Sequence, residues 1–371
     1  MSIDATDRRA IGVAIETIGP LDGAAMTAVA AHLDRLTKPP GSLGRLEELA
    51  TTIAGITGRV DAPVDRRWIV VAAGDHGVAS EGVSAYLPEV SAQMVANFVA
   101  GGAAINVLAS AAGASLAVVD VGVATPIPPP PADAGREDRG GRLLRARIAE
   151  GTANMTEGPA MGRTEALRAI GVGLQVVEDL RSDGGIDVLG LGEMGIGNTT
   201  AASAIVAVLT GAPVERVTGT GTGIDDDRRT HKIEVIERAI GVNRPDPADP
   251  IGVLAAVGGF EIAALVGLML GAAAARIPVV LDGFITGAAA LVGATLQPAL
   301  APRLIASHRS SEPGHTIILE RLGLRPYLEL DLRLGEGSGA ALLMGLLVAA
   351  GRIRDEMATF ESAAVSGPDD G

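Results

Sequence analysis

The sequence lacks cysteine and has very few aromatic side chains. The absence of cysteine from all 371 residues excludes disulfides, thiolate metal sites and cysteine nucleophiles. Aromatic residues make up 2% of the chain, whereas 47% is hydrophobic and 50 residues are glycine. A large core must therefore pack mainly through small side chains. A chain without cysteine also fits a reducing compartment, and we expect a cytoplasmic protein.

Positive charge is scarce as well. The chain has 30 Lys and Arg against 44 Asp and Glu, which gives a net charge of −14. This argues against nucleic-acid or anionic-membrane partners, because both need basic surface. Two apolar segments, residues 251–275 and 338–350, raise the question of a membrane helix. Glu261 interrupts the first and the second is too short, so we expect both to be buried helices.

Several catalytic signatures are missing. The sequence contains no HExxH pattern, and we predict no metal. It has no GxSxG or SxxK motif, which leaves serine acyl chemistry unsupported, and no GxxxxGK[ST] loop of the ATP-binding type. Asp75-His76 could bind a metal, but a hydrogen bond within a turn explains this pair better. We predict no cofactor.

Short apolar runs alternate with alanine-rich helical stretches. Continuous apolar strands that alternate with helices indicate an α/β fold, a parallel sheet with helices on both faces. Ligands of such sheets bind beyond the carboxyl ends of the strands. The runs lie at residues 68–77, 115–123, 186–195, 278–287 and 303–311. The polar residues at their ends are Asp75, His76, Asp120, Glu193, Asp282 and the stretch from His308 to Glu312.

Both ends of the chain have helical spacing, and we expect them to form a small helical subdomain. We divide the chain into a helical segment at 1–65, a parallel α/β nucleotide-binding domain at 66–315 and a C-terminal segment at 316–371 that closes the helical subdomain. Residues 126–141 contain a proline run that is incompatible with helix or strand, so we expect a loop there.

Residues 190–200 read GLGEMGIGNTT and lie between a predicted strand and a predicted helix. Their glycine spacing matches a dinucleotide fingerprint, with the acid Glu215 about twenty residues further on. The motif lies at mid-chain and has Glu193 inside the turn, which weakens the case for a nicotinamide-linked oxidoreductase. The alternative is a mononucleotide phosphate site at a helix N-terminus. Its donors would come from Gly195, Gly197, Asn198 and Thr199.

Two further glycine-rich turns have a charged residue nearby. A second glycine turn at 217–227 is followed by Lys232, which is either a cation for a phosphate or a solvated helix residue. Glu336 lies between two glycines just before an apolar helix. Complementing a helix dipole is worth about 1 kcal/mol or less and needs no flanking glycines, which suggest close approach of a ligand. Glu193 and Glu336 could supply a general base and a stabiliser of positive charge.

These motifs together resemble the nicotinate-nucleotide–dimethylbenzimidazole phosphoribosyltransferase family of cobalamin lower-ligand synthesis. The resemblance implies a Rossmann-like parallel sheet, a small helical subdomain made from both chain ends, and a homodimer. The matching stretches follow family order and are LTKPPGSLGRLEELA (36–50), GDHGV (74–78), VANFVAGGAAINVLA (95–109), GLGEMGIGNTT (190–200), GTGTGIDD (219–226), GGFEIAALVG (258–267), LDGFITGAAA (281–290), SHRSSEPGH (307–315) and LRLGEGSGAALLM (332–344).

The resemblance also implies a reaction. Nicotinate mononucleotide donates its phosphoribosyl group to 5,6-dimethylbenzimidazole, giving α-ribazole 5′-phosphate and nicotinate with inversion at the anomeric carbon. Another acceptor, such as adenine, a different benzimidazole or a phenolic, stays open, as does a non-catalytic nucleotide- or base-binding protein.

The resemblance assigns roles to individual positions. Glu336 matches the general base, Glu193 the second functional acid, and Asp282 a site acid near the nucleotide. The candidates for the acceptor base are Ser84, Tyr86 and Gln93, in a stretch where the sequence departs from the family pattern. The positions around the phosphate and ribose are Gly195, Gly221, Thr222, Lys232, Ser310 and Gly335.

Overall fold

A single parallel sheet forms the centre of the computed structural model, which describes residues 3–129, 139–221 and 223–366. Thr222, one of the predicted nucleotide residues, lies outside the described residues. The strand order is β3-β2-β1-β4-β5-β6, and every pairing is parallel. The predicted parallel α/β fold is therefore confirmed. The strands are β1 (Arg67–Gly74), β2 (Ala114–Gly122), β3 (Arg142–Arg145), β4 (Val188–Met194), β5 (Val279–Leu281) and β6 (Leu304–Ala306).

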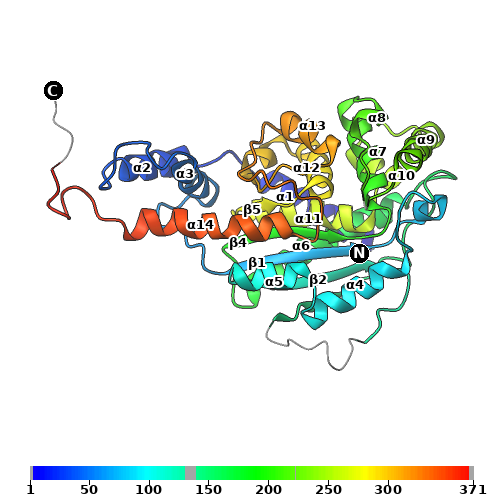
Figure 1. Ribbon diagram of the computed structural model, residues 1–371, viewed down its shortest axis with the longest axis horizontal. Coiled ribbons are helices and arrows are strands. Elements are labelled where there is room, and N and C mark those ends of the chain that lie inside the picture. Colours follow the sequence, from blue (N-terminus) through cyan, green and yellow to red (C-terminus); the bar gives the residue numbers. More distant parts are fainter. Residues whose placement is uncertain (1–2, 130–138, 222, 367–371) are drawn as a thin grey trace.

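Helices connect the strands and cover both faces of the sheet (Figure 1). They are α1 (Ile3–Thr17), α2 (Gly23–Leu33), α3 (Arg45–Thr57), α4 (Glu89–Ala100), α5 (Ala104–Ala111), α6 (Arg163–Ser182), α7 (Asn198–Thr210), α8 (Val214–Val217), α9 (Asp226–Asn243), α10 (Pro250–Val257), α11 (Phe260–Ala274), α12 (Phe284–Leu296), α13 (Pro313–Leu322) and α14 (Ser338–Glu356), with 3₁₀ turns η1 (Gly77–Glu81) and η3 (Pro298–Arg303).

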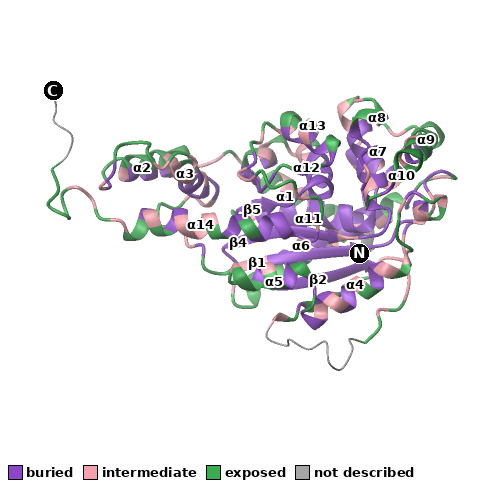
Figure 2. Cartoon of the chain, viewed as in Figure 1, coloured by how far each residue is buried: buried purple, intermediate pink, exposed green. Residues whose placement is uncertain are grey.

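The central strands are buried on both sides because their side chains alternate between two cores. Val70 and Ala72 of β1 belong to the core beneath α6, α11 and α12, whereas Ile69 and Val71 belong to the core beneath α4, α5 and α14. This is the period of two expected for a strand, and Figure 2 shows the central strands as mostly buried. The sheet thus fixes the positions of its carboxyl ends.

The edge strand β3 was not anticipated from the sequence. It reads RLLR and follows the proline-rich stretch, of which residues 130–138 lie outside the described part of the chain. Its side chains are exposed or half-buried, because β3 lies at the end of the sheet and pairs with β2 along one edge only. An edge strand of this kind lacks the continuous apolar run that marked the other five.

The chain ends meet away from the sheet. Helices α2 and α3 pack together, α14 packs against α3, and Leu36 pairs with Thr359 in an antiparallel bridge. Figure 1 shows α2, α3 and the outer half of α14 projecting from the sheet. Helix α1 lies elsewhere, against α6 and α11.

The apolar segments are core helices. Residues 251–275 form α10 and α11, which are separated at Gly258-Gly259, and 338–350 belong to α14. By length and composition, one stretch of the described residues, Glu89–Ala111, would suffice to cross a membrane. Gly101, with φ 84°, divides it into α4 and α5, and these helices pack on the sheet.

Candidate active site

Glu193 lies at the carboxyl end of β4, in the glycine turn that leads into α7. Its side chain is buried, and it accepts a hydrogen bond from the side-chain amide of Asn198, the first residue of α7. Gly197 caps α7 with φ 98°, in a region of backbone conformation that favours glycine. The side-chain amide of Asn198 is thus a hydrogen-bond donor to Glu193, and the turn holds this carboxylate in the protein interior.

Glu336 lies in a second glycine turn, immediately before α14. Gly335, Glu336 and Gly337 have φ values of 83°, 64° and 89°, so three successive residues are left-handed. The Glu336 carboxylate is buried, and the backbone N–H of Ile105 in α5 donates to it. Its Oε2 atom has no hydrogen-bond partner among the described residues. One acceptor atom is therefore available to a ligand.

The two turns are in direct contact. A Cβ atom on Gly192 would lie 2.5 Å from backbone atoms of Glu336 and Gly337, and one on Gly335 would overlap the carboxylate of Glu193. Only glycine at 192 and 335 permits this approach. The close packing brings the two predicted catalytic acids to one site, although they are far apart in the sequence.

Asp282 follows β5 and lies behind the Glu336 turn. Its Oδ2 accepts the backbone N–H of Gly337 at 2.9 Å, and its Oδ1 accepts that of Gly339 at 2.7 Å. The Nδ1 of His308 is 3.8 Å from Oδ1. The structure thus places Asp282 at the N-terminus of α14, where it contacts the turn that carries Glu336.

Buried negative charge shapes the electrostatics of this site. Burial, together with the charges of Asp282, Glu261 and Glu336, raises the pKa of Glu193 to about 8. Burial also raises the pKa values of Asp282 and Glu336 to about 7. These carboxyl groups are therefore partly protonated at neutral pH. A cationic ligand would favour their ionised forms, so the cluster suits a ligand with positive charge. A carboxylate with a pKa near 7 also suits general-base catalysis.

A second cluster, around Thr199, contains residues predicted to bind the phosphate. The Nζ of Lys232 donates to Thr199 Oγ1 at 2.7 Å, and a Cβ on Gly221 would lie 3.3 Å from that Nζ. Glu312 accepts the N–H of Gly221 at 2.9 Å, and its own N–H donates to Ser310 Oγ at 3.3 Å. The structure therefore brings Thr199, Gly221, Lys232 and Ser310 together.

Lys232 is buried on α9, with 1% of its surface exposed, so it is not a solvated helix residue. Burial lowers its pKa to about 8, although the nearby Glu312 carboxylate acts in the opposite direction. Lys232 is therefore still mostly charged at neutral pH. Arg333 lies beside it and donates to the carbonyl of Gly221 at 3.1 Å. Lys232 and Arg333 thus bring two positive charges to this cluster.

The histidines of this region carry no charge at neutral pH. Burial lowers the pKa of His308 to about 4, and burial together with the neighbouring histidine lowers that of His315 to about 3. The Nδ1 of His315 accepts the backbone N–H of Ser310 at 2.9 Å. These rings order the Ser310 loop and add no charge to the site.

Asp75 and His76 bind other elements of the protein. Asp75 accepts the N–H of Ala124 at 2.8 Å, and the Nε2 of His76 lies 2.6 Å from Glu261 Oε1 at the start of α11. Burial opposes a charge on His76, but the Glu261 carboxylate outweighs it and raises the pKa of His76. The part of the chain that the structure describes contains no group of three or more His, Asp or Glu residues suited to a metal.

The candidates for the acceptor base lie between η1 and the middle of α4. The side chain of Tyr86 is 54% exposed, Gln93 is exposed on α4, and Ser84 Oγ accepts the N–H of Tyr86 at 3.2 Å. The contact between α4 and the Glu193 turn comes instead from Ser91, whose Oγ accepts the N–H of Ile196 at 3.1 Å. Ser91 belongs to none of the stretches that carry the family resemblance, and Ile105 lies in the 95–109 stretch but contributes its backbone, which no side-chain pattern reveals.

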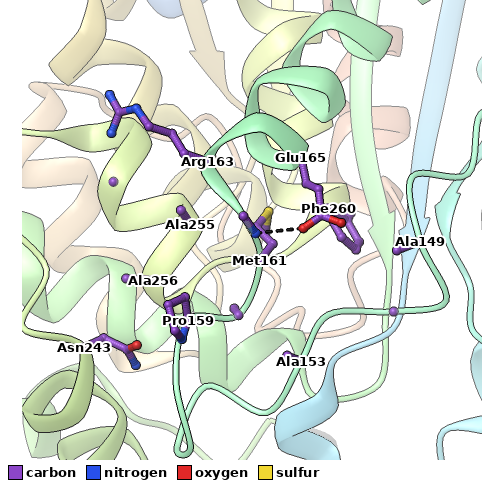
Figure 3. A pocket seen from close by; sticks show the side chains of 14 residues that line it. Ala149, Ala153, Pro159, Met161, Arg163, Glu165, Asn243, Ala255, Ala256 and Phe260 are labelled. Carbon is purple, nitrogen blue, oxygen red and sulfur yellow. Dashed lines mark hydrogen bonds between the residues drawn. The ribbon is translucent and has the colours of Figure 1, made fainter. Parts of the chain in front are cut away.

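A separate cavity of about 560 Å³ lies between the 149–163 loop and α10 (Figure 3). Its lining is mainly apolar, with Met161, Pro159 and several alanines. Its charged side chains are already paired, since Arg163 binds Asp249 and Glu165 accepts the N–H of Gly162. None of the predicted site residues lines it, and its described lining offers no unpaired cation to a phosphate.

Known proteins are similar to this chain in sequence and in fold. A family model described as phosphoribosyltransferase matches residues 18–365. The nicotinate-nucleotide–dimethylbenzimidazole phosphoribosyltransferases of Desulforudis audaxviator and Chloroflexus aggregans are each 54% identical, with 95% of this chain and 97% of theirs covered. The crystal structure of the Thermus thermophilus protein of that name is 45% identical with a TM-score of 0.84, covering 94% of this chain and 100% of that one. The chain therefore belongs to the nicotinate-nucleotide–dimethylbenzimidazole phosphoribosyltransferase family.

Proposed function

We propose that the protein transfers the 5-phosphoribosyl group of nicotinate mononucleotide to 5,6-dimethylbenzimidazole. The observation that carries this proposal is the contact between two glycine turns, at the carboxyl edge of the sheet, that carry the buried carboxylates Glu193 and Glu336. In the reaction, one benzimidazole nitrogen attacks C1′ of the ribose from the face opposite nicotinate. The C1′–nicotinate bond breaks, its electron pair leaves with nicotinate, and the anomeric centre inverts from β to α.

Glu336 is the proposed general base. It takes the N–H proton of the benzimidazole while the other ring nitrogen forms the new bond, so that the product nucleotide is neutral at its base. Its Oε2 has no partner among the described residues, and its pKa of about 7 lets it accept a proton at neutral pH.

Glu193 is proposed to act on the positive part of the donor. The pyridinium ring carries a positive charge, and the ribose gains oxocarbenium character as the bond to nicotinate breaks. A fixed carboxylate next to that centre stabilises the developing charge. The bound cation would also lower the pKa of Glu193 from about 8, so that the carboxylate ionises when the donor arrives.

The phosphate is proposed to bind in the Thr199 cluster. Lys232 and the backbone of Gly221 would contact it, together with the hydroxyl groups of Thr199 and Ser310. Gly195, Gly197 and Asn198 of the Glu193 turn would line the ribose together with Gly335 of the Glu336 turn, and Thr222 remains a predicted ligand. We place the acceptor base near Ser84, Tyr86 and Gln93.

The test is direct. Purified protein is incubated with nicotinate mononucleotide and dimethylbenzimidazole without added metal, and nicotinate release and the new nucleotide are followed by chromatography and mass spectrometry. A product with the mass of α-ribazole phosphate is the expected result. Adenine, other benzimidazoles and phenolics in competition rank the acceptors. Binding of the nucleotide without any product would contradict the proposal in favour of a binding protein.

We further propose that the protein is a cytoplasmic homodimer, as the family resemblance implies. The exposed apolar side chains Tyr86, Leu87, Leu330 and Leu334 support an association between copies of the chain. Light scattering behind size-exclusion chromatography should give twice the mass of the chain, and fractionation of the native cell should place the protein in the cytoplasm. A monomeric mass at micromolar concentration would contradict the dimer.

A further inference from the structure

We infer that Asp282 is a positioning residue that holds Glu336 in its catalytic conformation by binding the backbone of the Glu336 turn. This inference rests on the proposed function of Glu336. It differs from the role that the sequence indicates for Asp282, which was contact with the nucleotide. Both carboxylate oxygens of Asp282 already accept hydrogen bonds from the protein backbone, which leaves this side chain a structural role.

Both carboxylate oxygens of Asp282 are occupied by the N-terminus of α14. Oδ2 accepts the N–H of Gly337 at 2.9 Å, Oδ1 accepts the N–H of Gly339 at 2.7 Å, and the N–H of Ala340 adds a further interaction. The first N–H groups of a helix have no partner within the helix. Asp282 therefore supplies a cap from a distant strand, where α14 has no capping side chain of its own.

The cap acts on a strained turn. Glu336 has φ 64°, a left-handed conformation that is uncommon and energetically unfavourable for a residue with a side chain. Such a conformation persists only where the surroundings fix it. Asp282 binds the residue after Glu336 on one side, and Gly192 packs against the backbone of Glu336 on the other. The turn is thus held between β4 and Asp282.

Asp282 is itself held from behind. The hydroxyl of Ser307 donates to the Asp282 carbonyl at 3.1 Å and also contacts the Nδ1 of His308, which lies 3.8 Å from Asp282 Oδ1. Asp282 is buried, with 1% of its surface exposed. A side chain so enclosed suits the fixing of a backbone turn better than the binding of a ligand that comes and goes.

A double-mutant cycle tests the inference. Asp282→Asn replaces one acceptor by a donor and should lower kcat by about 10-fold or more, with the KM for nicotinate mononucleotide changed by less than about 2-fold. In a Glu336→Ala background, the same substitution should change kcat by less than about 2-fold, because the residue it positions is gone. Asp282→Ser is the second variant: its shorter side chain withdraws both acceptor contacts without placing a donor against the turn, and it should lower kcat in the same way.

The outcomes separate the two proposals. If Glu336→Ala retains full turnover, the proposed role of Glu336 fails. If Glu336→Ala is slow but Asp282→Asn lowers kcat equally in both backgrounds, or raises the KM for the nucleotide, Asp282 does not act through Glu336. Failure of both Asp282 variants to fold, judged by thermal unfolding and calorimetric binding of nicotinate mononucleotide, would also overturn the inference.

Asp249 provides a matched control. It caps α10 by accepting the N–H of Gly252 at 3.1 Å, as Asp282 caps α14, but it is half-buried and pairs with Arg163. Asp249→Asn should lower thermal stability and leave kcat within about 2-fold of wild type. A loss of kcat in both variants would show that weakened caps act on turnover through general instability.

Discussion

At the scale of single residues, the site is defined by carboxyl groups whose charge depends on their surroundings. Glu193 and Glu336 have the same side chain, yet the pKa of Glu193 is about 8 and that of Glu336 about 7. Burial raises both pKa values, and three neighbouring acids raise that of Glu193 further. Two acids with different proton affinities can take different roles in one reaction.

The first prediction concerns Glu336. Glu336→Gln keeps the shape of the side chain and removes its ability to accept a proton. We expect kcat to fall by about 10²-fold or more, while calorimetric affinity for nicotinate mononucleotide is largely retained. In the wild type, activity should rise with pH through about 7 as Glu336 ionises. A variant with normal turnover and the same pH profile would contradict the role of base.

The second prediction concerns stability and pH. The folded-state pKa values of Glu193, Asp282, Glu336 and His76 lie above their ordinary values, so the folded chain binds more protons than the unfolded chain near neutrality. Their contribution to stability is fully present below the unfolded pKa values and is lost as pH rises through the folded ones. The two buried histidines of the Ser310 loop have lowered pKa values and oppose this trend below about pH 6.5, so the Tm of the ligand-free protein should fall mainly between about pH 6.5 and pH 8, by roughly 5 °C.

Glu193→Gln provides the control for this effect. Glutamine does not titrate, so the fall in Tm from about pH 6.5 to pH 8 should be smaller in the variant than in the wild type. Calorimetry at a series of pH values measures both slopes. Equal slopes would mean that Glu193 ionises in the folded chain much as it does in the unfolded chain.

At the scale of elements, small residues let helices and turns approach closely. Helices α6 and α11 cross with Gly173 and Gly267 at their contact, and a Cβ on either residue would overlap backbone atoms of the other helix. The scarcity of aromatic residues in the sequence has its counterpart in these backbone contacts. The position of α11 matters for the site, because Glu261 at its start binds His76.

The third prediction follows from this contact. Gly267→Ala should force α6 and α11 apart and lower the free energy of unfolding by roughly 3 kcal/mol, as overpacking of a tight contact does. The matched control is Gly241→Ala on α9, where a Cβ would meet nothing within 4 Å. That variant should gain up to about 1 kcal/mol, because alanine favours the helix. Urea denaturation measures both, and a loss in Gly241→Ala equal to that in Gly267→Ala would refute the packing argument.

How far the sequence predicts the molecule also depends on the element. The apolar runs IVVAA at residues 69–73 and VLGL at residues 188–191 identify their strands, because a strand buried on both faces needs apolar side chains throughout. The sequence did not predict β3, because this strand is short, has charged ends and lies at the edge of the sheet. The pairing of His76 with Glu261 could not be predicted, since those residues are 185 positions apart and only the fold brings them together. The glycines around Glu193 and Glu336 indicated close approach, but not that each turn approaches the other.

At the scale of the whole molecule, charge is the dominant feature. The net charge of −14 surrounds a site that must accept an anionic nucleotide. The buried cation Lys232 supplies only local attraction within its cluster. The surface as a whole repels the phosphate and carboxylate of the donor during its approach, and this repulsion extends over a Debye length of about 30 Å at 0.01 M salt and about 8 Å at 0.15 M.

The fourth prediction is therefore a dependence on salt. Raising the ionic strength from about 0.01 to 0.15 M screens the repulsion, and the KM for nicotinate mononucleotide should fall by about 2- to 3-fold. Dimethylbenzimidazole is neutral, so its KM should stay constant, which makes it an internal control in the same assay. Steady-state kinetics with a large, weakly binding salt anion provides the measurement. If the KM for the nucleotide rises instead, the local field of Lys232 and Arg333 governs the approach of the donor, and salt anions compete for the phosphate site.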